Sequence, residues 1–444
     1  MNPLISQASS LYLPLNQLSP HCTRLLNSLH DGRANQKESI LFEQTLWNEV
    51  KKVRALNDTS IFLYLVGYYH TILYQIAKLK APNDLFQYHV LIRIGDLNRY
   101  MLRNDVAEYY YCTARNLFPY FGHAYNQLGL LTKPTNCYKC CYYYARAARS
   151  TEKPLTSIAD SNLRIAVSKY NCSILSHILN GETHIDLAED GGLKNVSDSP
   201  ETVLKWFYVI VVAIYADNIQ PITKAFLRFM NDNFSTQKAT TVRDSVKTTK
   251  IYCDRESYIL LASLDILFDW MRLGSQRRAI CPAVSTELRQ IRSCLQSILS
   301  SCRDHCGINA ISLLSATDTN LSTVSSECVN SDTAFQSSST ALSPGSALCK
   351  PNALPHDYVM KGFSPLDSVH RELVFKAGFQ PRGTLDDSID GCCEGRKFVD
   401  AAQLEQLVNR LRAKMEGLAP LIRKQTRNIA LESIISNMNR DCGS

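Results

Sequence analysis

The sequence lacks any apolar run long enough to cross a lipid bilayer. Its longest such run, residues 206–216 (WFYVIVVAIYA), has eleven residues, whereas a membrane-spanning helix needs about 20. The first ten residues also lack the charged start and apolar core of a secretory signal peptide. We therefore expect a cytoplasmic chain, with shuttling to the nucleus left open, and a buried helix at residues 206–216.

The sequence also lacks the short motifs that hold phosphates, metals or catalytic groups in common enzymes. It has no G-x-x-x-x-G-K or G-x-G-x-x-G phosphate loop, no H-E-x-x-H zinc helix and no G-x-S-x-G nucleophile turn. Its ten histidines are scattered singly, and a single histidine is more often a surface or core residue than a catalyst. We therefore expect no enzymatic activity, no cofactor and no metal.

Neither sign of charge dominates. The 48 Lys and Arg residues are nearly balanced by 41 Asp and Glu residues, which leaves a net charge of +7. This balance permits an anionic partner, but it gives little long-range attraction for nucleic acid.

Cysteine is plentiful, with 16 residues, and in the absence of a signal peptide we expect reduced thiols. Cys137 and Cys140 form a C-x-x-C pair with Cys141 beside it, but no second pair follows at usable spacing, so zinc is not predicted. The alternative is that Cys140 replaces a small alanine of a helical repeat, followed by Tyr144 and Ala147.

That repeat is the clearest pattern present. Gly95 and Gly129 lie 34 residues apart (129 − 95), the period of a tetratricopeptide repeat. Small residues let two antiparallel helices approach, large ones fill the gaps, and proline ends the second helix. The residues that fit are Leu91, Ile94, Gly95, Ala107, Tyr111, Ala114 and Pro119, then Tyr125, Leu128 and Gly129. Such a repeat presents a surface for a partner.

Helical periodicity extends over most of the chain, and strand signals are scarce. Helices are predicted over residues 40–55, 61–79, 85–100, 155–179, 203–233, 258–273, 285–301 and 401–439. Between residues 315 and 346, 15 of 32 residues are Ser or Thr, which is too little apolar surface to offset the cost of ordering the chain, so we predict a disordered insertion there. The predicted fold class is all-α, an extended helical solenoid.

Several segments together resemble the adaptor family of telomerase recruitment and nonsense-mediated mRNA decay. They are residues 46–48 (LWN) with Lys51 and Lys52, residues 94–100 (IGDLNRY), 109–114 and 125–129 (YNQLG), residues 269–273 (DWMRL), and residues 354–366, an L-P-x-D stretch leading into G-F-x-P-L. The resemblance implies a 14-3-3-like tetratricopeptide domain at residues 1–235. It also implies a helical-hairpin domain at residues 251–314 and 351–440, on either side of a Ser/Thr-rich insertion at residues 315–350. The chain looks most like the short members, which lack a PIN nuclease domain.

The G-D-x-x-R-Y string at residues 95–100 also looks like the phosphate-binding helix of 14-3-3 proteins. Holding a phosphoserine, with about −1.5 to −2 charges, takes at least two cationic donors from different helices. The resemblance implies a phosphopeptide site made of Lys51, Lys52, Arg99, Tyr100 and Asn126. It favours Lys52 over Lys51 as the donor from the first helix.

Each of these residues also has a structural interpretation. Paired lysines commonly form a solvated helix face, and Arg99 has Asp96 within reach at i, i+3. Tyr100 suits core packing, and Asn126 suits a helix cap. The family resemblance, rather than the spacing, favours the binding role.

The function implied by the resemblance is that of an adaptor in nonsense-mediated mRNA decay. Its partners would be the phosphorylated RNA helicase of the surveillance complex, a related 14-3-3-like adaptor in a heterodimer, and decay factors or a phosphatase. The alternative is a telomere-associated or single-stranded nucleic-acid-binding repeat protein, with Tyr142, Tyr143 and Tyr144 stacking on bases. Because three consecutive side chains of a helix point in different directions, at least one must face the repeat core, and Tyr144 fits that position.

Overall fold

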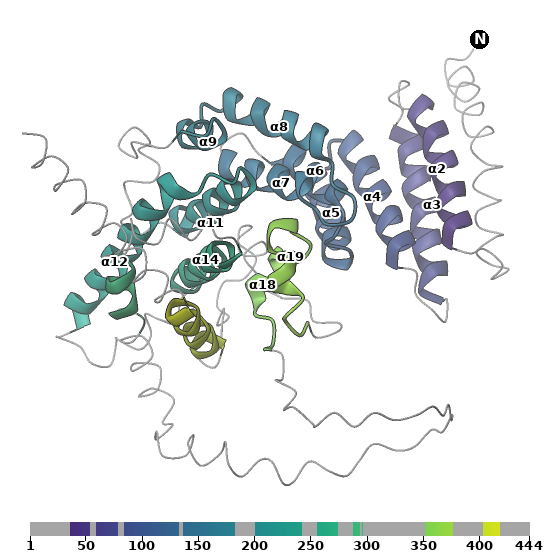
Figure 1. The fold of residues 1–444 in the computed structure, drawn as a ribbon. Helices are drawn as coiled ribbons and strands as arrows, with labels where there is room; N and C mark the ends of the chain where they lie inside the picture. The colour runs from purple at the N-terminus through teal and green to yellow at the C-terminus, as the bar shows by residue number, and fades with distance from the viewer. Residues whose placement is uncertain are drawn as a thin grey trace, which may run out of the picture. The chain divides into compact units, whose positions relative to one another are not determined.

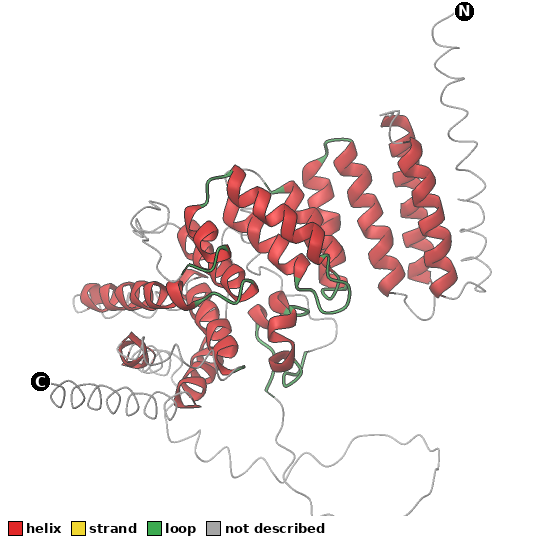
Figure 2. Cartoon of the chain, turned by 45° about the horizontal axis from the view of Figure 1, so that its top comes forward, coloured by secondary structure: helices red, strands yellow, loops and turns green. Residues whose placement is uncertain are grey.

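The structure is a computed structural model of the chain, and it describes residues 36–53, 59–78, 84–132, 136–182, 200–241, 255–273, 287–293, 295, 351–375 and 403–417. Every named element in these ranges is a helix, and the extended backbone within them is limited to isolated bridges (Figure 2). The all-α fold class is thus confirmed. The predicted Ser/Thr-rich insertion lies outside the described residues.

The helices follow one another along the chain as Figure 1 labels them. They are α2 (Gln36–Val53), α3 (Thr59–Lys78), α4 (Asp84–Tyr100), α5 (Asn104–Leu117), α6 (Gly122–Leu131), α7 (Cys137–Ala148), α8 (Thr156–Lys169), α9 (Ser173–Leu179), α11 (Pro200–Tyr215), α12 (Gln220–Thr241), α14 (Arg255–Arg272), α18 (Pro355–Met360), the short 3-10 helix η3 (Ser364–Leu366) and α19 (Asp367–His370). Residues 287–293 and 403–417 are helical as well.

Two helices that the periodicity predicts as continuous are each divided in two. The predicted helix at residues 155–179 is interrupted at Asn171, and the one at residues 203–233 at Asp217, with φ angles of 50° and 54°. Asn and Asp tolerate this left-handed conformation better than other side chains do, so they end a helix without interrupting the apolar pattern. Periodicity alone therefore did not reveal these breaks.

The contacts group the chain into two compact units. Unit 1 contains the described residues up to Ser176 together with the segment Lys361–Asp367, and unit 2 contains the remaining described residues. This division reflects packing, whereas the predicted boundary at residue 235 rests on family resemblance, so the predicted domain ranges stay predictions.

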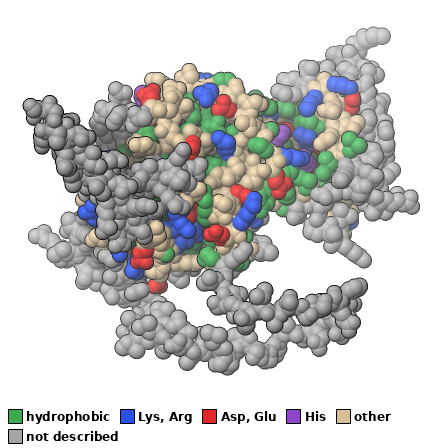
Figure 3. Space-filling model, in the orientation of Figure 1, with side chains coloured by type: hydrophobic (Ala, Val, Ile, Leu, Met, Phe, Trp, Pro, Cys, Tyr) green, Lys and Arg blue, Asp and Glu red, His purple; other side chains and the backbone are tan. Residues whose placement is uncertain are grey.

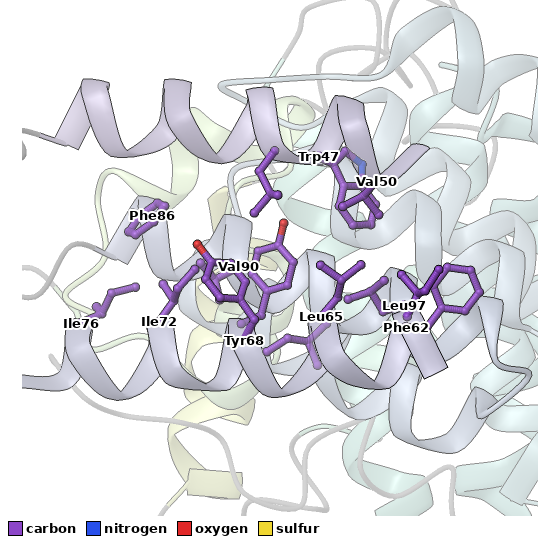
Figure 4. Close-up of a cluster of buried hydrophobic side chains, with 14 residues drawn as sticks. Trp47, Val50, Phe62, Leu65, Tyr68, Ile72, Ile76, Phe86, Val90 and Leu97 are labelled. Atoms are coloured by element: carbon purple, nitrogen blue, oxygen red, sulfur yellow. The ribbon is translucent and has the colours of Figure 1, made fainter. Parts of the chain in front are cut away.

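The first three helices of unit 1 share one apolar core. Figure 4 shows side chains of α2, α3 and α4 pointing toward one another, among them Trp47, Leu65, Ile72 and Val90. These four are at most 3% exposed, and each large buried aliphatic or aromatic side chain contributes about 1.5–3 kcal/mol to folding. This core fixes the position of α2 against α4.

The repeat pattern is confirmed by what the two glycines face. A Cβ atom on Gly95 would lie 2.4 Å from Cε1 of Tyr111, and one on Gly129 would lie 2.6 Å from Cε1 of Tyr144. Each glycine thus makes room for the tyrosine of the following helix. Cys140 takes the small-residue position in the second repeat, where its thiol contacts the carbonyl oxygen of Gly129 at 3.4 Å.

A segment distant in the sequence completes unit 1. The amide of Thr151 donates to the carbonyl of Gly362 (3.1 Å), and the amide of Ser364 donates to the carbonyl of Arg149 (2.8 Å). Phe363, between them, is fully buried. Gly362 has a φ of +77°, and a Cβ there would lie 2.5 Å from the carbonyl oxygen of Pro119. Only glycine suits both the conformation and the space.

Arg146 of α7 joins this segment to the repeat. Its side chain is fully buried, and Nη2 donates to the hydroxyl of Tyr125 (2.7 Å) and to the carbonyl of Lys361 (2.8 Å). The guanidinium also lies 5.1 Å from the ring centre of Phe363. The distant segment therefore supplies one hydrogen bond and one aromatic contact to this buried cation.

The cysteines of the second repeat differ in their bonding. Cys137 is joined to Cys172 in a disulfide, so the prediction of reduced thiols is wrong for this pair. Burial raises the pKa of the free Cys140 thiol to about 11, and the pKa of Cys141 rises for the same reason.

Unit 2 contains the apolar run at residues 206–216. It lies in α11, where every residue from Trp206 to Ile214 is at most 3% exposed, which confirms the predicted buried helix. Among the described residues no helix is long and apolar enough to cross a membrane.

A buried ion network lies on α14, α18 and the helix at residues 403–417. The guanidinium of Arg410 holds both carboxylate oxygens of Asp357 (2.6 and 2.7 Å) and one of Asp265 (2.7 Å). Lys414 holds the other oxygen of Asp265 (2.7 Å), and His356 contacts this carboxylate at 3.0 Å. Although Asp265, His356 and Asp357 lie close enough together to ligate a metal, side-chain cations already occupy the carboxylates.

Candidate phosphopeptide-binding site

The predicted site residues lie on three helices of unit 1: Lys51 and Lys52 on α2, Arg99 and Tyr100 on α4, and Asn126 on α6. α2 packs against α4, and the amide of Asn162 on α8 donates to the side-chain oxygen of Asn126 (3.0 Å). Figure 3 shows histidine and basic side chains next to one another over the part of the chain where α4 lies.

Arg93 on α4 is fixed in place by α2. Its Nε and Nη2 donate to the two carboxylate oxygens of Glu43, at 2.7 and 3.3 Å. The guanidinium lies 4.5 Å from the ring centre of Trp47, and the hydroxyl of Tyr69 also donates to Glu43 at 3.2 Å. Glu43 is fully buried, so this pair aligns the two helices and leaves Arg93 little freedom to bind a ligand.

Arg99, two turns further along α4, is held more loosely. Its Nη2 lies 3.7 Å from Asp96, and its Nε lies 3.4 Å from the hydroxyl of Tyr111. That hydroxyl donates to Asp96 at 2.7 Å, and burial, together with Asp96, raises the Tyr111 pKa so that the proton stays in place. The Arg99 side chain is 25% exposed.

Tyr100 orients this arginine. The guanidinium lies 4.9 Å from the centre of the Tyr100 ring, and the ring itself stacks on Trp47 with centres 6.4 Å apart. Tyr100 is half-buried against the core of α2 to α4. The Tyr100 ring thus packs against Trp47 and also helps to orient the guanidinium of Arg99.

The two lysines differ in their surroundings. Lys52 is 70% exposed and pairs with Glu49 at 2.7 Å, an exposed pair of a kind that contributes at most about 1 kcal/mol. Lys51 is exposed and forms no ion pair with any residue in the described parts of the chain. Binding an anion at Lys51 therefore breaks no existing pair, whereas Lys52 would first give up Glu49.

The pKa of His123 on α6 is affected by cations of both α2 and α4. Burial lowers the pKa of His123 below its usual range, and the Asp96 carboxylate only partly opposes this. The cations Arg93, Arg99 and Lys51 lower the pKa further. The His123 ring is thus within electrostatic range of cations from both α2 and α4.

The sequence reasoning missed Arg93, Glu43 and His123. Arg93, Asp96 and Arg99 recur at i, i+3, i+6, which was a signal that one face of α4 is charged. His123 and Gln127 recur at i, i+4, which places them on one face of α6. The role of Glu43 had no such signal, because it lies 50 residues from Arg93.

The tyrosines considered for base stacking are buried. Tyr142, Tyr143 and Tyr144 are at most 5% exposed, so none offers a ring face to a nucleotide. Tyr144 faces the repeat core, as expected, but the other two are buried as well. The stacking platform predicted for the nucleic-acid alternative is therefore wrong.

Residues 107–242 match the family model of the Est1 DNA/RNA binding domain. The match confirms, over that range, the expected resemblance to the adaptor family of telomerase recruitment and nonsense-mediated decay. It includes α6 with His123 and Asn126, whereas α2 and α4 lie before it.

Among solved structures, a chain of "Structure of the C. elegans SMG5-SMG7 complex" is similar at 14% sequence identity and a TM-score of 0.39. The similarity covers 63% of this chain and 84% of that one. None of the curated proteins matches this chain.

Proposed function

We propose that this chain is an adaptor that binds peptides phosphorylated on Ser or Thr, through cations of α2 and α4 beside α6. The observation that carries the proposal is the partly exposed and loosely held guanidinium of Arg99 on α4, with the exposed Lys51 on α2, the helix packed against α4. Charge-assisted hydrogen bonds from two helices are what a phosphate needs to compete with water. Asn126, on the same helix as His123, is placed to bond the peptide backbone.

The biological setting of the proposal comes from the family. We propose that the phosphorylated peptide belongs to the RNA helicase of the mRNA surveillance complex, and that the adaptor links it to decay or dephosphorylation in the cytoplasm. Pairing with a related 14-3-3-like adaptor is part of the same proposal. Since the matched family model describes a binding domain, we propose no catalytic role.

Charge reversal at the cations tests the site. Arg99→Glu, or Lys51→Glu combined with Lys52→Glu, should weaken phosphopeptide binding at least about tenfold, because each charge-assisted hydrogen bond contributes about 1.5–3 kcal/mol. The measurement is fluorescence anisotropy of the full chain with a phosphoserine-glutamine peptide. Lys78→Glu, a reversal of an exposed lysine at the far end of α3, is the matched control and should bind normally.

The helical content must stay intact for this reading. If circular dichroism shows that Arg99→Glu unfolds the chain, Arg99 is structural and the assignment of the site fails. The same conclusion holds if Lys78→Glu weakens binding as much as the site variants do, because the effect would then reflect overall charge.

A second candidate is direct binding of single-stranded DNA or RNA, which the name of the matched family model favours. Titrating the full chain with an oligonucleotide at two salt concentrations distinguishes it. Backbone binding loses affinity steeply with salt, in proportion to the number of phosphates contacted. Tight, salt-dependent binding that outcompetes the phosphopeptide would make nucleic acid the principal ligand.

A further inference from the structure

We propose that His123 and Gln127 form a proton-coupled subsite. When a phosphate binds, His123 takes up a proton from solvent. The Gln127 amide then turns so that its oxygen accepts a hydrogen bond from the protonated ring. This inference rests on the proposed phosphopeptide function and names two residues that the family resemblance did not. Both side chains lie on α6, one helical turn apart.

The present hydrogen bond describes a neutral histidine. Nε2 of Gln127 lies 3.1 Å from Nε2 of His123. An amide N–H can only donate, so the histidine nitrogen must be the acceptor and must carry no proton. In this arrangement the other end of the amide, Oε1 of Gln127, is buried and has no hydrogen-bond partner in the described parts of the chain.

The unpartnered oxygen offers a second arrangement. Gln127 is only 9% exposed, so an unsatisfied polar atom there costs free energy. Turning the amide by 180° exchanges its oxygen and nitrogen with little change in shape. The oxygen then faces His123 and accepts from Nε2–H of the charged ring, and the turned NH₂ group is free to donate to a bound peptide carbonyl.

Burial and the charges around His123 explain why it stays neutral without a ligand. The groups in electrostatic range are Lys51 on α2 and Arg93, Asp96 and Arg99 on α4. His89, also on α4, does not compete for the proton, since burial first and then Arg93 lower its pKa to about 4. Burial is the largest cause of the lowered His123 pKa, and Arg93, Arg99 and Lys51 add to it against Asp96, so a positive charge on His123 is unfavourable.

Several charged groups on the other neighbouring helices have partners of their own. Glu108 on α5 pairs with Lys139 on α7, Arg146 on α7 binds Tyr125, and Asp160 on α8 pairs with Arg164. The field at His123 is therefore set mainly by α2 and α4.

A bound phosphate adds negative charge to the surroundings of His123. It brings about −1.5 to −2 charges close to these cations. That charge offsets the cations and attracts a proton to His123, so binding and protonation favour each other. Phosphopeptide affinity should then rise as the pH falls from 8 to 6, by up to about tenfold for each unit by which phosphate raises the pKa of His123.

The test compares proton uptake in the full-length chain with that in His123→Gln. Calorimetric titrations with the phosphoserine-glutamine peptide, in buffers of different ionisation enthalpy at pH 7, give the number of protons taken up per peptide bound. The phosphate's own protonation contributes equally to both proteins and cancels in the difference. Wild type should take up more protons than His123→Gln, and Gln127→Leu should lie between them.

The outcomes separate this inference from the proposed function. Equal proton uptake in wild type and His123→Gln, with phosphopeptide preference retained, overturns the subsite and leaves the function standing. Absence of phosphopeptide preference in wild type overturns both.

If His123→Gln fails to fold, the wild-type chain still decides the question. With ¹³C-labelled histidine, the NMR titration midpoint of the His123 ring should move to higher pH when the phosphopeptide is added. An unchanged midpoint contradicts the inference.

Discussion

Arg93 and Arg99 show how two similar side chains on one helix serve different purposes. Arg93 donates hydrogen bonds to both carboxylate oxygens of the buried Glu43, and its guanidinium lies over the Trp47 ring. Arg99 has long contacts to Asp96 and Tyr111, lies over the Tyr100 ring, and keeps a quarter of its side chain exposed. The first arginine fixes α2 against α4, and the second remains available to a ligand.

Glu43→Gln should therefore destabilise unit 1 strongly. Breaking a buried pair by removing one partner costs about 3–5 kcal/mol, because the remaining charge is left buried and unpaired. Glu49→Gln, which breaks the exposed pair with Lys52, should cost under about 1 kcal/mol. Urea unfolding followed by circular dichroism compares the two, and equal costs would contradict the distinction between Arg93 and the surface cations.

The sequence predicted the ligand candidates but not the residues that hold them. Five candidates could be predicted because they lie in short motifs that match those of the resembled family: Lys51, Lys52, Arg99, Tyr100 and Asn126. Glu43 and Trp47 lie on α2 and contact Arg93 on α4, with α3 between them in the sequence, and no local pattern predicts such a contact. The binding role of the five residues stays a prediction.

The repeat is explained by the packing of one element against the next. Gly95 and Gly129 each lie under a tyrosine of the following helix. This pairing was predictable because the 34-residue period and the small-residue positions are local features of the sequence. The breaks at Asn171 and Asp217 were not, since apolar periodicity continues through them.

Gly95→Ala and Gly129→Ala should each destabilise unit 1 by about 1–3 kcal/mol, because the added methyl group overlaps a buried tyrosine ring. Gly67→Ala is the control: it also lies in a helix interior, but its added methyl meets nothing within 4 Å. It should stabilise by about 0.5–1 kcal/mol, since alanine favours helix over glycine. Thermal unfolding of the three variants gives the comparison, and the same sign for all three would refute this packing.

The ion network of unit 2 predicts a pH-dependent contribution to stability. Burial alone would raise the pKa of Asp265, but Lys414 and Arg410 outweigh it and hold the pKa below its usual range. Burial would likewise raise the pKa of Asp357, and His356 and Arg410 lower it. A carboxylate with a lowered folded pKa stabilises above its unfolded pKa of about 4, and this stabilisation is lost as the pH falls below that value. Asp269, whose pKa is raised by burial, opposes the trend.

Arg410→Met should accordingly cost about 3–5 kcal/mol at pH 7 and less at about pH 3, where the buried carboxylates that have lost the cation become protonated. Urea unfolding at the two pH values, followed by tryptophan fluorescence, measures the difference. Arg412→Met removes a neighbouring arginine whose pair with Glu416 is long, at 4.0 Å, and exposed. It should change little at either pH, and a pH-independent cost for Arg410→Met would argue against the network.

The folded chain as a whole depends on a contact between residues far apart in sequence. Arg146 lies 215 residues from Lys361, whose carbonyl it binds. The G-F-x-P-L string at residues 362–366 was visible as a family signature, but its place in unit 1 was not, because such long-range contacts leave no period in the sequence. A fragment ending at residue 235 lacks this segment, so binding is best measured on the full chain.

Phe363→Ala should destabilise unit 1 by about 3–5 kcal/mol, the cost of removing a fully buried aromatic ring. It should also remove one of the two aromatic rings that Arg146 faces, leaving that of Tyr125. Ser364→Ala, at the exposed next position, should have little effect. Thermal unfolding of both variants tests this, and an unchanged Phe363→Ala midpoint would show that the segment is dispensable.

The account's central claim is that this all-helical chain distinguishes a phosphorylated peptide from an unphosphorylated one. The most direct measurement is the ratio of Kd values for the full chain with the phosphoserine-glutamine peptide and its unphosphorylated twin, by fluorescence anisotropy at fixed salt. Two charge-assisted hydrogen bonds at the phosphate predict at least about a hundredfold preference for the phosphorylated peptide. Equal binding of the two peptides, or binding of neither, would contradict the claim.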